Sequence, residues 1–271
     1  SGRVSAASGA NPIFQAGTYF KLGGNADVNG NISIGTTGSV VSGIVKQPSG
    51  ATYTGPAANK VTGTPDLPVF PAIPPITNFA NFPYGTVSVT SGVITPGKYK
   101  YLNPTGSKTI TFSGPGIYVF KEVDVDGNDN TFVFDFKNLP GNIIIYVYND
   151  VDLYKLKVSI KGGGDASRIF AETHGNGSSD DDRDNHQGCA WNHINTTSGS
   201  GNGQWKGTIW APYGSISLGF NSQNSDYEGA FWSGKQVILK GNVKLKYIPM
   251  VAQCSNPIAN AGADAVIPCG Q

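Results

Sequence analysis

The chain has 271 residues, a formal net charge of +1 and only 14% charged residues. Its basic residues are scattered rather than clustered, which excludes nucleic acid as a partner, and no run of about 18 apolar residues occurs, which excludes a membrane-spanning helix. The 37 glycines disfavour helices and suit short strands joined by tight turns, so the composition predicts an all-β protein.

The first predicted elements are short strands over residues 14–45. Apolar side chains such as Ala26, Val28, Ile32 and Ile34 alternate with polar ones between turn residues, with no helical period. Each run is three to five residues long. Strands of that length are typical of a narrow coil wound around one core, which is the pattern of a solenoid.

A proline-rich stretch follows, over about residues 62–84. Six prolines fall between Pro65 and Pro83, and a central strand cannot run through them because proline lacks the backbone donor that a ladder needs. The stretch also carries Leu67, Phe70 and Phe79, which a solvated linker would not. We therefore predict an extended strap that packs along one face of the solenoid. A polyproline ligand for a partner domain is the alternative, but the prolines lack regular PxxP spacing.

Alternating strand patterns return at residue 86 and continue to about residue 247. The clearest repeat lies near the end, where Gly207 and Gly229, and likewise Trp210 and Trp232, are 22 residues apart. A self-similar spacing of about 20 residues is what one turn of a three-sided parallel β-helix requires, because each coil must stack on the last.

One segment interrupts this pattern, over about residues 172–205. It is rich in Gly, Asn, Asp and Ser and holds all three histidines, His174, His186 and His193. We predict a long polar loop that projects between two coils, and loops of that length are often functional. The predicted fold class is thus all-β: a right-handed parallel β-helix (β-solenoid) over residues 1–252, with a Pro-rich strap and one long polar loop.

Three cysteines, Cys189, Cys254 and Cys269, form no close pair of the kind that binds a metal. In an oxidising compartment two of them would pair and the third would find its partner beyond Gln271. Three free thiols are the alternative, and the sequence leaves both open.

The strings PGIYVFKEVDVDGNDNTFVFDF, GNIIIYVYNDVDL and GTIWAPYGSISLGFNSQNSDYEGAFWSGKQVIL carry a resemblance to known proteins. They resemble secreted bacterial β-solenoid domains of the choice-of-anchor A and ice-binding-like families, over residues 94–247. The ice-binding relatives use a flat face of regularly spaced Thr. Thr109 and Thr111 share one strand here, but the sequence shows no T-x-T ladder across successive coils, so ice binding is not expected.

The final string, SNPIANAGADAVIPCGQ, resembles the opening strand of a PKD or related immunoglobulin-like repeat. This resemblance places the start of a following repeat at residues 253–271 and implies that Cys269 pairs within that repeat. It also implies a large secreted cell-surface protein of the Bacteroidota kind.

Aromatic residues within and just after the predicted loop are candidates for contact with sugar rings. The predicted ligand-binding set is Trp191, Trp205, Trp210, Tyr213 and Trp232. Trp210 and Trp232 are one coil apart, so they are expected to stack on the same side, either as a core ladder or as a surface ridge.

Carboxylates provide the remaining candidates. Asp180, Asp182 and Asp184 in the loop, and Asp124 and Asp126 in DVDGNDN, could offer oxygen ligands to calcium, although solvated turns are the simpler interpretation.

A hydrolase would need two carboxylates on one face, and residues two apart in a strand share a face. Asp124 with Asp126 and Asp226 with Glu228 meet this condition, but no catalytic residue is assigned.

The expected function is that of a non-enzymatic structural or adhesive module, secreted and held at a bacterial cell surface. Its loop or lateral face would contact glycans, surfaces or other copies of itself, since solenoid ends expose unpaired edges. Calcium is the one cofactor considered, and no nucleic acid or membrane insertion is expected. The alternative is a carbohydrate-active β-helix, a polysaccharide lyase or hydrolase.

Overall fold

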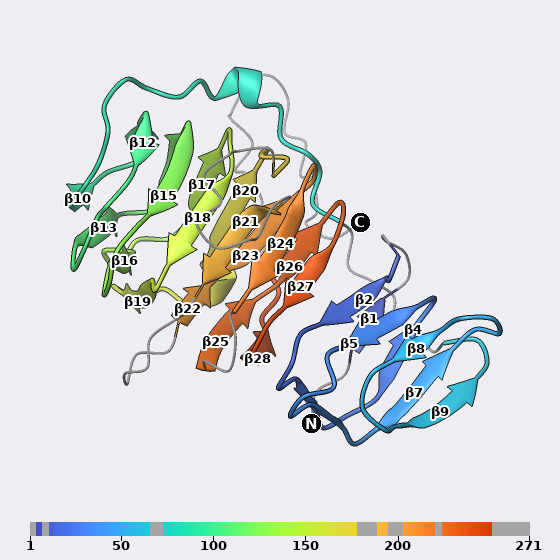
Figure 1. Ribbon diagram of the computed structural model, residues 1–271. Coiled ribbons are helices and arrows are strands. Elements are labelled where there is room, and N and C mark those ends of the chain that lie inside the picture. The colour runs from blue at the N-terminus through green and yellow to red at the C-terminus, as the bar shows by residue number, and fades with distance from the viewer. Residues whose placement is uncertain are drawn as a thin grey trace.

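The computed structural model describes residues 4–6, 11–65, 73–177, 189–194, 203–219 and 224–250. Over these residues the chain is all-β, and its all-parallel sheets form a β-solenoid of about nine turns (Figure 1). The predicted fold class, a parallel β-helix, is confirmed. The described part contains two short 3-10 helices, η1 (Phe79–Asn81) and η2 (Ala166–Arg168).

The body of the solenoid consists of six successive strand triplets, from β10–β12 to β25–β27, stacked into three sides. The first side holds a four-stranded and a three-stranded sheet: β10 (Gly92–Ile94), β13 (Thr109–Ser113), β16 (Thr131–Asp135), β19 (Lys157–Lys161), then β22 (Gly203–Lys206), β25 (Asn224–Gly229) and β28 (Asn242–Tyr247). The second side is a six-stranded sheet: β11 (Gly97–Lys98), β14 (Gly116–Phe120), β17 (Ile143–Val147), β20 (Ile169–Thr173), β23 (Thr208–Ala211) and β26 (Phe231–Ser233). The third side begins a nine-stranded sheet: β12 (Tyr101–Leu102), β15 (Glu122–Val125), β18 (Val151–Tyr154), β21 (Cys189–Ile194), β24 (Ser215–Leu218) and β27 (Val237–Leu239).

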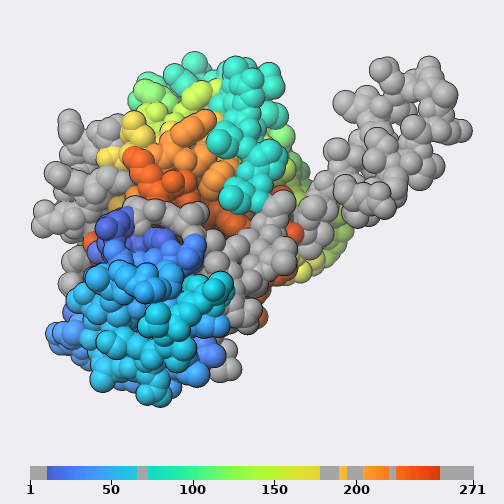
Figure 2. Space-filling view, turned by 90° about the vertical axis from the view of Figure 1, so that its right-hand side faces the viewer, coloured from blue at the N-terminus to red at the C-terminus, as the bar shows by residue number. Residues whose placement is uncertain are grey.

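The N-terminal coils stack on the last coil of the body rather than on the first. The nine-stranded sheet continues from β27 into β2 (Phe14–Ala16), β5 (Ile32–Ile34) and β8 (Tyr53–Thr54). The same coils form a second four-stranded sheet and a two-stranded sheet: β1 (Val4–Ala6), β4 (Ala26–Val28), β7 (Ile44–Gln47) and β9 (Asn59–Thr62), and β3 (Lys21–Leu22) with β6 (Val40–Val41). In Figure 2 the blue N-terminal coils lie directly against the orange and red coils of the body.

Side chains alternate between the interior and the outer faces because successive residues of a strand point to opposite sides. In β13, Ile110 and Phe112 are fully buried, and they stand in register with Phe132 and Phe134 of β16. Thr111 lies between the two buried positions and faces outward. The strands therefore build one continuous apolar core from in-register columns of Ile, Val, Leu and Phe.

The 22-residue repeat marks two glycines that meet in adjacent coils. A Cβ on Gly229 would lie 2.0 Å from the carbonyl oxygen of Gly207, and both residues have positive φ, +151° and +126°. Only glycine tolerates both conditions. Three residues after these glycines, Trp210 stands in register with Trp232, so the predicted coil spacing is correct.

The predicted strap is also confirmed over its described part, residues 73–84. Phe79 and Phe82 of the strap form a second hydrophobic cluster with side chains on the outer face of the six-stranded sheet, including Val119 and Tyr146. The strap thus runs back along the solenoid toward the start of β10, as Figure 1 shows. Residues 66–72 lie outside the described residues.

The predicted boundaries of the long loop, residues 172–205, are wrong. Glu172 and Thr173 belong to β20, Cys189–Ile194 form β21 in the nine-stranded sheet, and Gly203–Lys206 form β22. The polar composition hid the strand pattern, because in β21 the buried positions are held by a tryptophan and a histidine rather than by aliphatic residues. Residues 178–188 and 195–202 lie outside the described residues.

The free edge of the N-terminal coils carries a charged side chain at an inward position. In β7 the core residue Val45 is 1% exposed, and it stands in register with Lys60 of the edge strand β9. The Lys60 ammonium lies 5.8 Å from the centre of the Tyr53 ring. An inward-pointing lysine on an edge strand opposes the addition of a further strand at this end of the stack.

The structure describes no part of residues 253–271, so the predicted start of a following repeat stays a prediction. Cys254 and Cys269 lie outside the described residues, and Cys189 is half-buried in β21. Among the described residues, no helix has the length and apolar character needed to cross a membrane.

Candidate functional site

Trp191 and Trp205, two members of the predicted sugar-binding set, lie in the solenoid core. They are 2% and 1% exposed, and their rings meet edge to face at a centroid distance of 4.8 Å. Trp191 stands in register between Val151 and Ile216, both of which point inward. Their placement on an exposed patch is therefore wrong: both indoles fill the interior of the stack.

Trp210 and Trp232 stack on the same side, as predicted, on the outer face of the six-stranded sheet. Trp210 is 6% exposed within the second hydrophobic cluster, and Trp232 packs against that cluster while half-buried. The ladder is thus neither part of the solenoid interior nor a bare ridge. Tyr213 remains 46% exposed beside it, so Tyr213 and Trp232 are the members of the predicted set that a ligand can reach.

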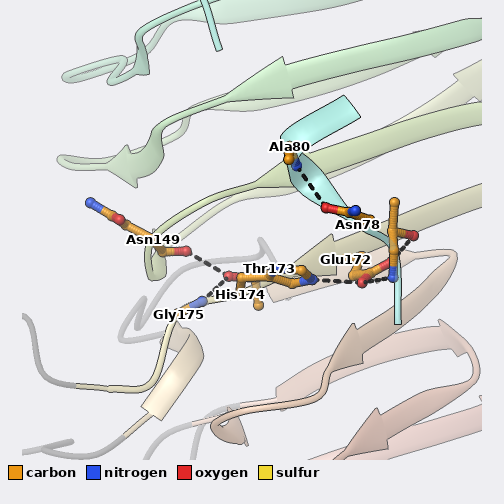
Figure 3. A network of polar contacts seen from close by, with 8 residues as sticks. Asn78, Ala80, Asn149, Glu172, Thr173, His174 and Gly175 are labelled. Carbon is orange, nitrogen blue, oxygen red and sulfur yellow. Dashed lines mark hydrogen bonds and ion pairs between the residues drawn. The ribbon is translucent and has the colours of Figure 1, made fainter. Parts of the chain in front are cut away.

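The strap is fixed to the body at a polar site centred on Glu172 of β20. Thr77 of the strap donates its backbone N–H to Glu172 Oε1 at 2.9 Å and its hydroxyl to Glu172 Oε2 at 2.6 Å (Figure 3). Glu172 has no exposed side-chain area. The carboxylate is therefore held by two charge-assisted hydrogen bonds from a segment 95 residues earlier in the chain.

His174 completes this site from the same strand end. Its Nε2 lies 2.8 Å from Glu172 Oε1, and because a carboxylate only accepts, Nε2–H donates. The imidazole stacks on the Phe79 ring at 3.6 Å and 3°, and it meets the Tyr213 ring edge to face at 5.1 Å. We call Thr77, Phe79, Glu172, His174 and Tyr213 the strap site.

Two tyrosines of β17 and its following turn support the strap site. The Tyr148 hydroxyl donates to the carbonyl oxygen of Phe79 at 2.6 Å, and the rings of Tyr146 and Tyr148 both pack on the Phe79 ring at 5.1 Å. Burial raises the pKa of Tyr146, and the nearby Glu172 carboxylate adds to the rise. Phe79 is thus enclosed by aromatic rings on the outer face of the sheet.

The sequence held a signal for this site that composition alone did not reveal. Glu172 and His174 are two residues apart, so on a strand they share a face. Because the sequence predicts a projecting polar loop over residues 172–205, it does not place both side chains on a strand. Their partner Thr77 lies in the strap, and no local pattern connects the two.

Glu172→Ala is expected to lower the free energy of unfolding by about 2–3 kcal/mol, because it leaves the Thr77 N–H and the His174 ring without their acceptor. Glu172→Gln keeps an acceptor and should lose about half as much. Urea unfolding measures the stability, and limited proteolysis within residues 73–84 measures release of the strap. Glu122→Ala, at a half-buried carboxylate of β15, is the control and should change stability by less than about 0.5 kcal/mol. Equal effects at the two positions would contradict the role of Glu172.

The carboxylates predicted to bind calcium separate into different environments. Asp126 Oδ1 accepts from the N–H of Gly127 at 2.7 Å, in the turn that follows β15. In the same turn Asn128 accepts from Lys155 Nζ at 2.6 Å, and Asp129 forms an ion pair with Lys157 at 2.7 Å, which lowers the Asp129 pKa. Two neighbouring oxygen groups of DVDGNDN therefore face lysines.

Asp124 has an acidic neighbour on the next strand, besides Asp126 on its own chain segment. It stands in register with Asp152 of β18, and Asp152 stands in register with Asn192, all on the outer face of the nine-stranded sheet. The described residues contain no cluster of three or more His, Cys, Asp or Glu side chains suited to a metal ion. Calcium at Asp124 and Asp126 stays a prediction, and Asp180, Asp182 and Asp184 lie outside the described residues.

Asp226 and Glu228 share the outer face of β25, as predicted, but they stand between strands that carry lysines. Asp226 lies 3.8 Å from Lys244, and Glu228 lies 4.0 Å from Lys246. Glu228 is also in register with Lys206 on its other side. The arrangement is a ladder of alternating charge rather than a pair of carboxylates facing a common substrate.

No protein-family model matches the chain, and no curated protein or solved structure matches it either. The resemblance to the choice-of-anchor A and ice-binding-like domains, and to a PKD repeat, therefore stays an expectation from the sequence. The fold and the strap site provide the evidence on function.

Proposed function

We propose that this chain is a non-enzymatic structural and adhesive module of a secreted bacterial cell-surface protein. The observation that carries the proposal is the strap. It crosses the outer face of the six-stranded sheet and is fixed there by Glu172, so neighbouring coils are joined by a second connection besides their ladders. Such reinforcement suits a rod that holds its shape while its sides contact another surface.

The lateral faces that remain open support the adhesive part of the proposal. On the four-stranded sheet of the body, one outward column consists of Val93, Thr111, Val133 and Ser159, and beside it Thr109 and Thr131 form a second column that ends in Lys157. Small and β-branched side chains on a parallel sheet give a regular, flat face. A flat face of this kind fits an extended or repetitive surface better than a single small molecule.

Tyr213 of the strap site and Trp232 offer a second contact surface, suited to sugar rings. Tyr213 is 46% exposed, and its edge is set against the His174 ring at 5.1 Å, so its orientation is fixed before any ligand arrives. Pre-ordered aromatic side chains bind with a smaller loss of conformational freedom. We therefore place the glycan contact at these two residues, without Trp191 and Trp205.

The experiment is binding of the purified chain to a panel of polysaccharides, with and without EDTA, while released sugar ends are assayed. Binding without release is expected, and Tyr213→Ala should weaken it severalfold. Tyr247→Ala, at an exposed tyrosine of β28, is the matched control and should bind like the parent chain. Loss of binding in EDTA would assign calcium to the contact. Equal binding by the Tyr213→Ala and Tyr247→Ala variants would show that Tyr213 does not contact the glycan.

A carbohydrate-active β-helix remains the second candidate because of one observation. Asp124 and Asp152 are side by side on adjacent strands, which lie about 4.8 Å apart, close to the separation that a retaining glycosidase needs. Release of sugar ends that Asp124→Asn and Asp152→Asn each abolish would establish this alternative and overturn the adhesive proposal.

A further inference from the structure

In the described part of the chain, the N-terminal coils are attached to the body at two places. Through the chain, they are followed by the strap, whose described residues 73–84 lead along the body toward β10 at its far end. In space, their seat is the last coil of the body, where β2 pairs with β27 through Gln15 with Ile238 and Ala16 with Leu239. The partners that meet at this seat are therefore more than 220 residues apart in sequence.

The seat is narrow in the described residues. The nine-stranded sheet crosses it without a break, but the six-stranded sheet ends at β26 and the three-stranded sheet ends at β28. The hydrogen bonds there include Gly17 N–H to the carbonyl oxygen of Leu239, 2.6 Å, and Gln236 Nε2 to Gln15 Oε1, 3.1 Å. One of the three sides of the solenoid thus carries the continuous ladder across the seat.

The interior column of the three-stranded sheet confirms that the seat is open on that side. Trp205, Tyr227 and Leu245 stand in register, and their exposed fractions are 1%, 1% and 46%. Tyr247, also on β28, is 61% exposed. Leu245 of β28 therefore occupies an inward position, but no further described strand covers its side chain. The N-terminal coils therefore seat on the body without closing all of its sides.

We infer that the last coil of the body is an exchangeable docking surface whose partner is the N-terminal unit, residues 4–62, of a second copy of this chain. The N-terminal unit of a second copy would make the same β2–β27 contacts as the chain's own unit, because the two copies have identical sequences. Exchange of identical elements is a low-cost route to dimers when the connecting segment is long enough. The inference concerns assembly and does not depend on glycan binding.

The connecting segment has the necessary reach. Thr77 is fixed at Glu172 of β20, and six strand spacings separate the coil of β20 and β21 from the coil of β9, where the segment begins, which is roughly 29 Å. The residues between Thr62 and Thr77 can extend to about 46 Å. The spare length of about 17 Å lets the unit move off its own seat while the strap stays in place.

The other end of the N-terminal unit limits the product. Lys60 occupies an inward position on β9, which disfavours a further unit that would continue the ladder beyond that strand. Exchange at the β27–β2 seat is therefore the route to assembly that the described strands favour. Two chains that donate to each other form a closed dimer with two-fold symmetry.

The test uses single-cysteine chains in which Cys189, Cys254 and Cys269 are replaced by serine. One chain carries Gln15→Cys and the other Ile238→Cys, and these positions are in register across the seat, within reach of a disulfide. The two chains are unfolded, mixed, refolded at high concentration and oxidised. A covalent dimer is expected. Ser33→Cys with Ile238→Cys is the matched control, because Ser33 lies one strand further on, about 9.6 Å away, and should not form a link.

One further chain makes the result decisive. The double variant Gln15→Cys/Ile238→Cys should link within one chain when refolded dilute. Failure of that link would mean that the seat itself is absent and would overturn the inference, as would a double variant that links while the mixed chains do not.

Discussion

Trp205→Ala is expected to lower the free energy of unfolding by about 3–5 kcal/mol, the usual cost of removing a large aromatic side chain from a packed core. The indole is 1% exposed and touches the rings of Trp191 and Phe134, at centroid distances of 4.8 and 5.9 Å. Its loss leaves a cavity that parallel ladders on three sides cannot collapse to fill. Urea unfolding followed by tryptophan fluorescence and circular dichroism measures the loss.

Two other variants separate this role from a role in binding. Trp205→Phe keeps an aromatic ring in the core and should cost about 1–2 kcal/mol, so it provides a folded protein if the alanine variant does not fold. Tyr247→Ala, at a residue 61% exposed, should stay within about 0.5 kcal/mol of the parent chain. A Trp205→Ala variant that unfolds like the parent chain but no longer binds glycans would mean that the indole contacts ligand after all.

The second large effect is a loss of stability in mild acid caused by His193. This ring is fully buried beside Tyr227, and burial lowers its pKa to about 3, although the backbone of Leu156 opposes the fall. The folded protein therefore keeps His193 neutral, whereas the unfolded chain takes up a proton near pH 6.5. Stability from this residue is fully present above pH 6.5 and is lost as the pH falls toward 3. Between these two pH values, the free energy of unfolding falls by up to about 1.4 kcal/mol per pH unit.

Urea unfolding of the parent chain and of His193→Leu at pH 7, 6 and 5 measures this effect. The parent chain should lose about 2 kcal/mol between pH 7 and pH 5, and the variant should lose most of that dependence. Asp135 does not affect this comparison. Hydrogen bonding to Lys137 lowers the pKa of Asp135 to about 2, so its effect on the pH dependence of stability falls below about pH 4. Parallel pH profiles for the two proteins would show that His193 is not the source.

The sequence predicted the coil of this fold because the coil is a local feature. Alternation of apolar residues and the spacing of Gly207 and Gly229 follow from one strand stacking on the next, and both can be recognised without knowing the rest of the chain. The strap was recognised for a similar reason, since prolines exclude a central strand while Phe79 and its apolar neighbours need a surface to cover.

The parts that were missed depend on contacts between distant segments. Trp191 and His193 alternate as core residues do, but their polar setting favoured a loop, and only the register with Val151 and Leu153 places them inside. Glu172 meets Thr77 because the strap runs back over the sheet. The seat of β2 on β27 joins opposite ends of the described chain, and no repeat spacing predicts which coil comes last.

The order of the coils also bears on how the protein is made. The coils built from residues 11–62 leave the ribosome first, yet their place in the ladder exists only after Val237–Leu239 have been synthesised and paired. During synthesis, the sheet edge of the early coils therefore stays unpaired while the body forms. Contacts of such large sequence separation form slowly, so the last step of folding is the arrival of the segment that was made first.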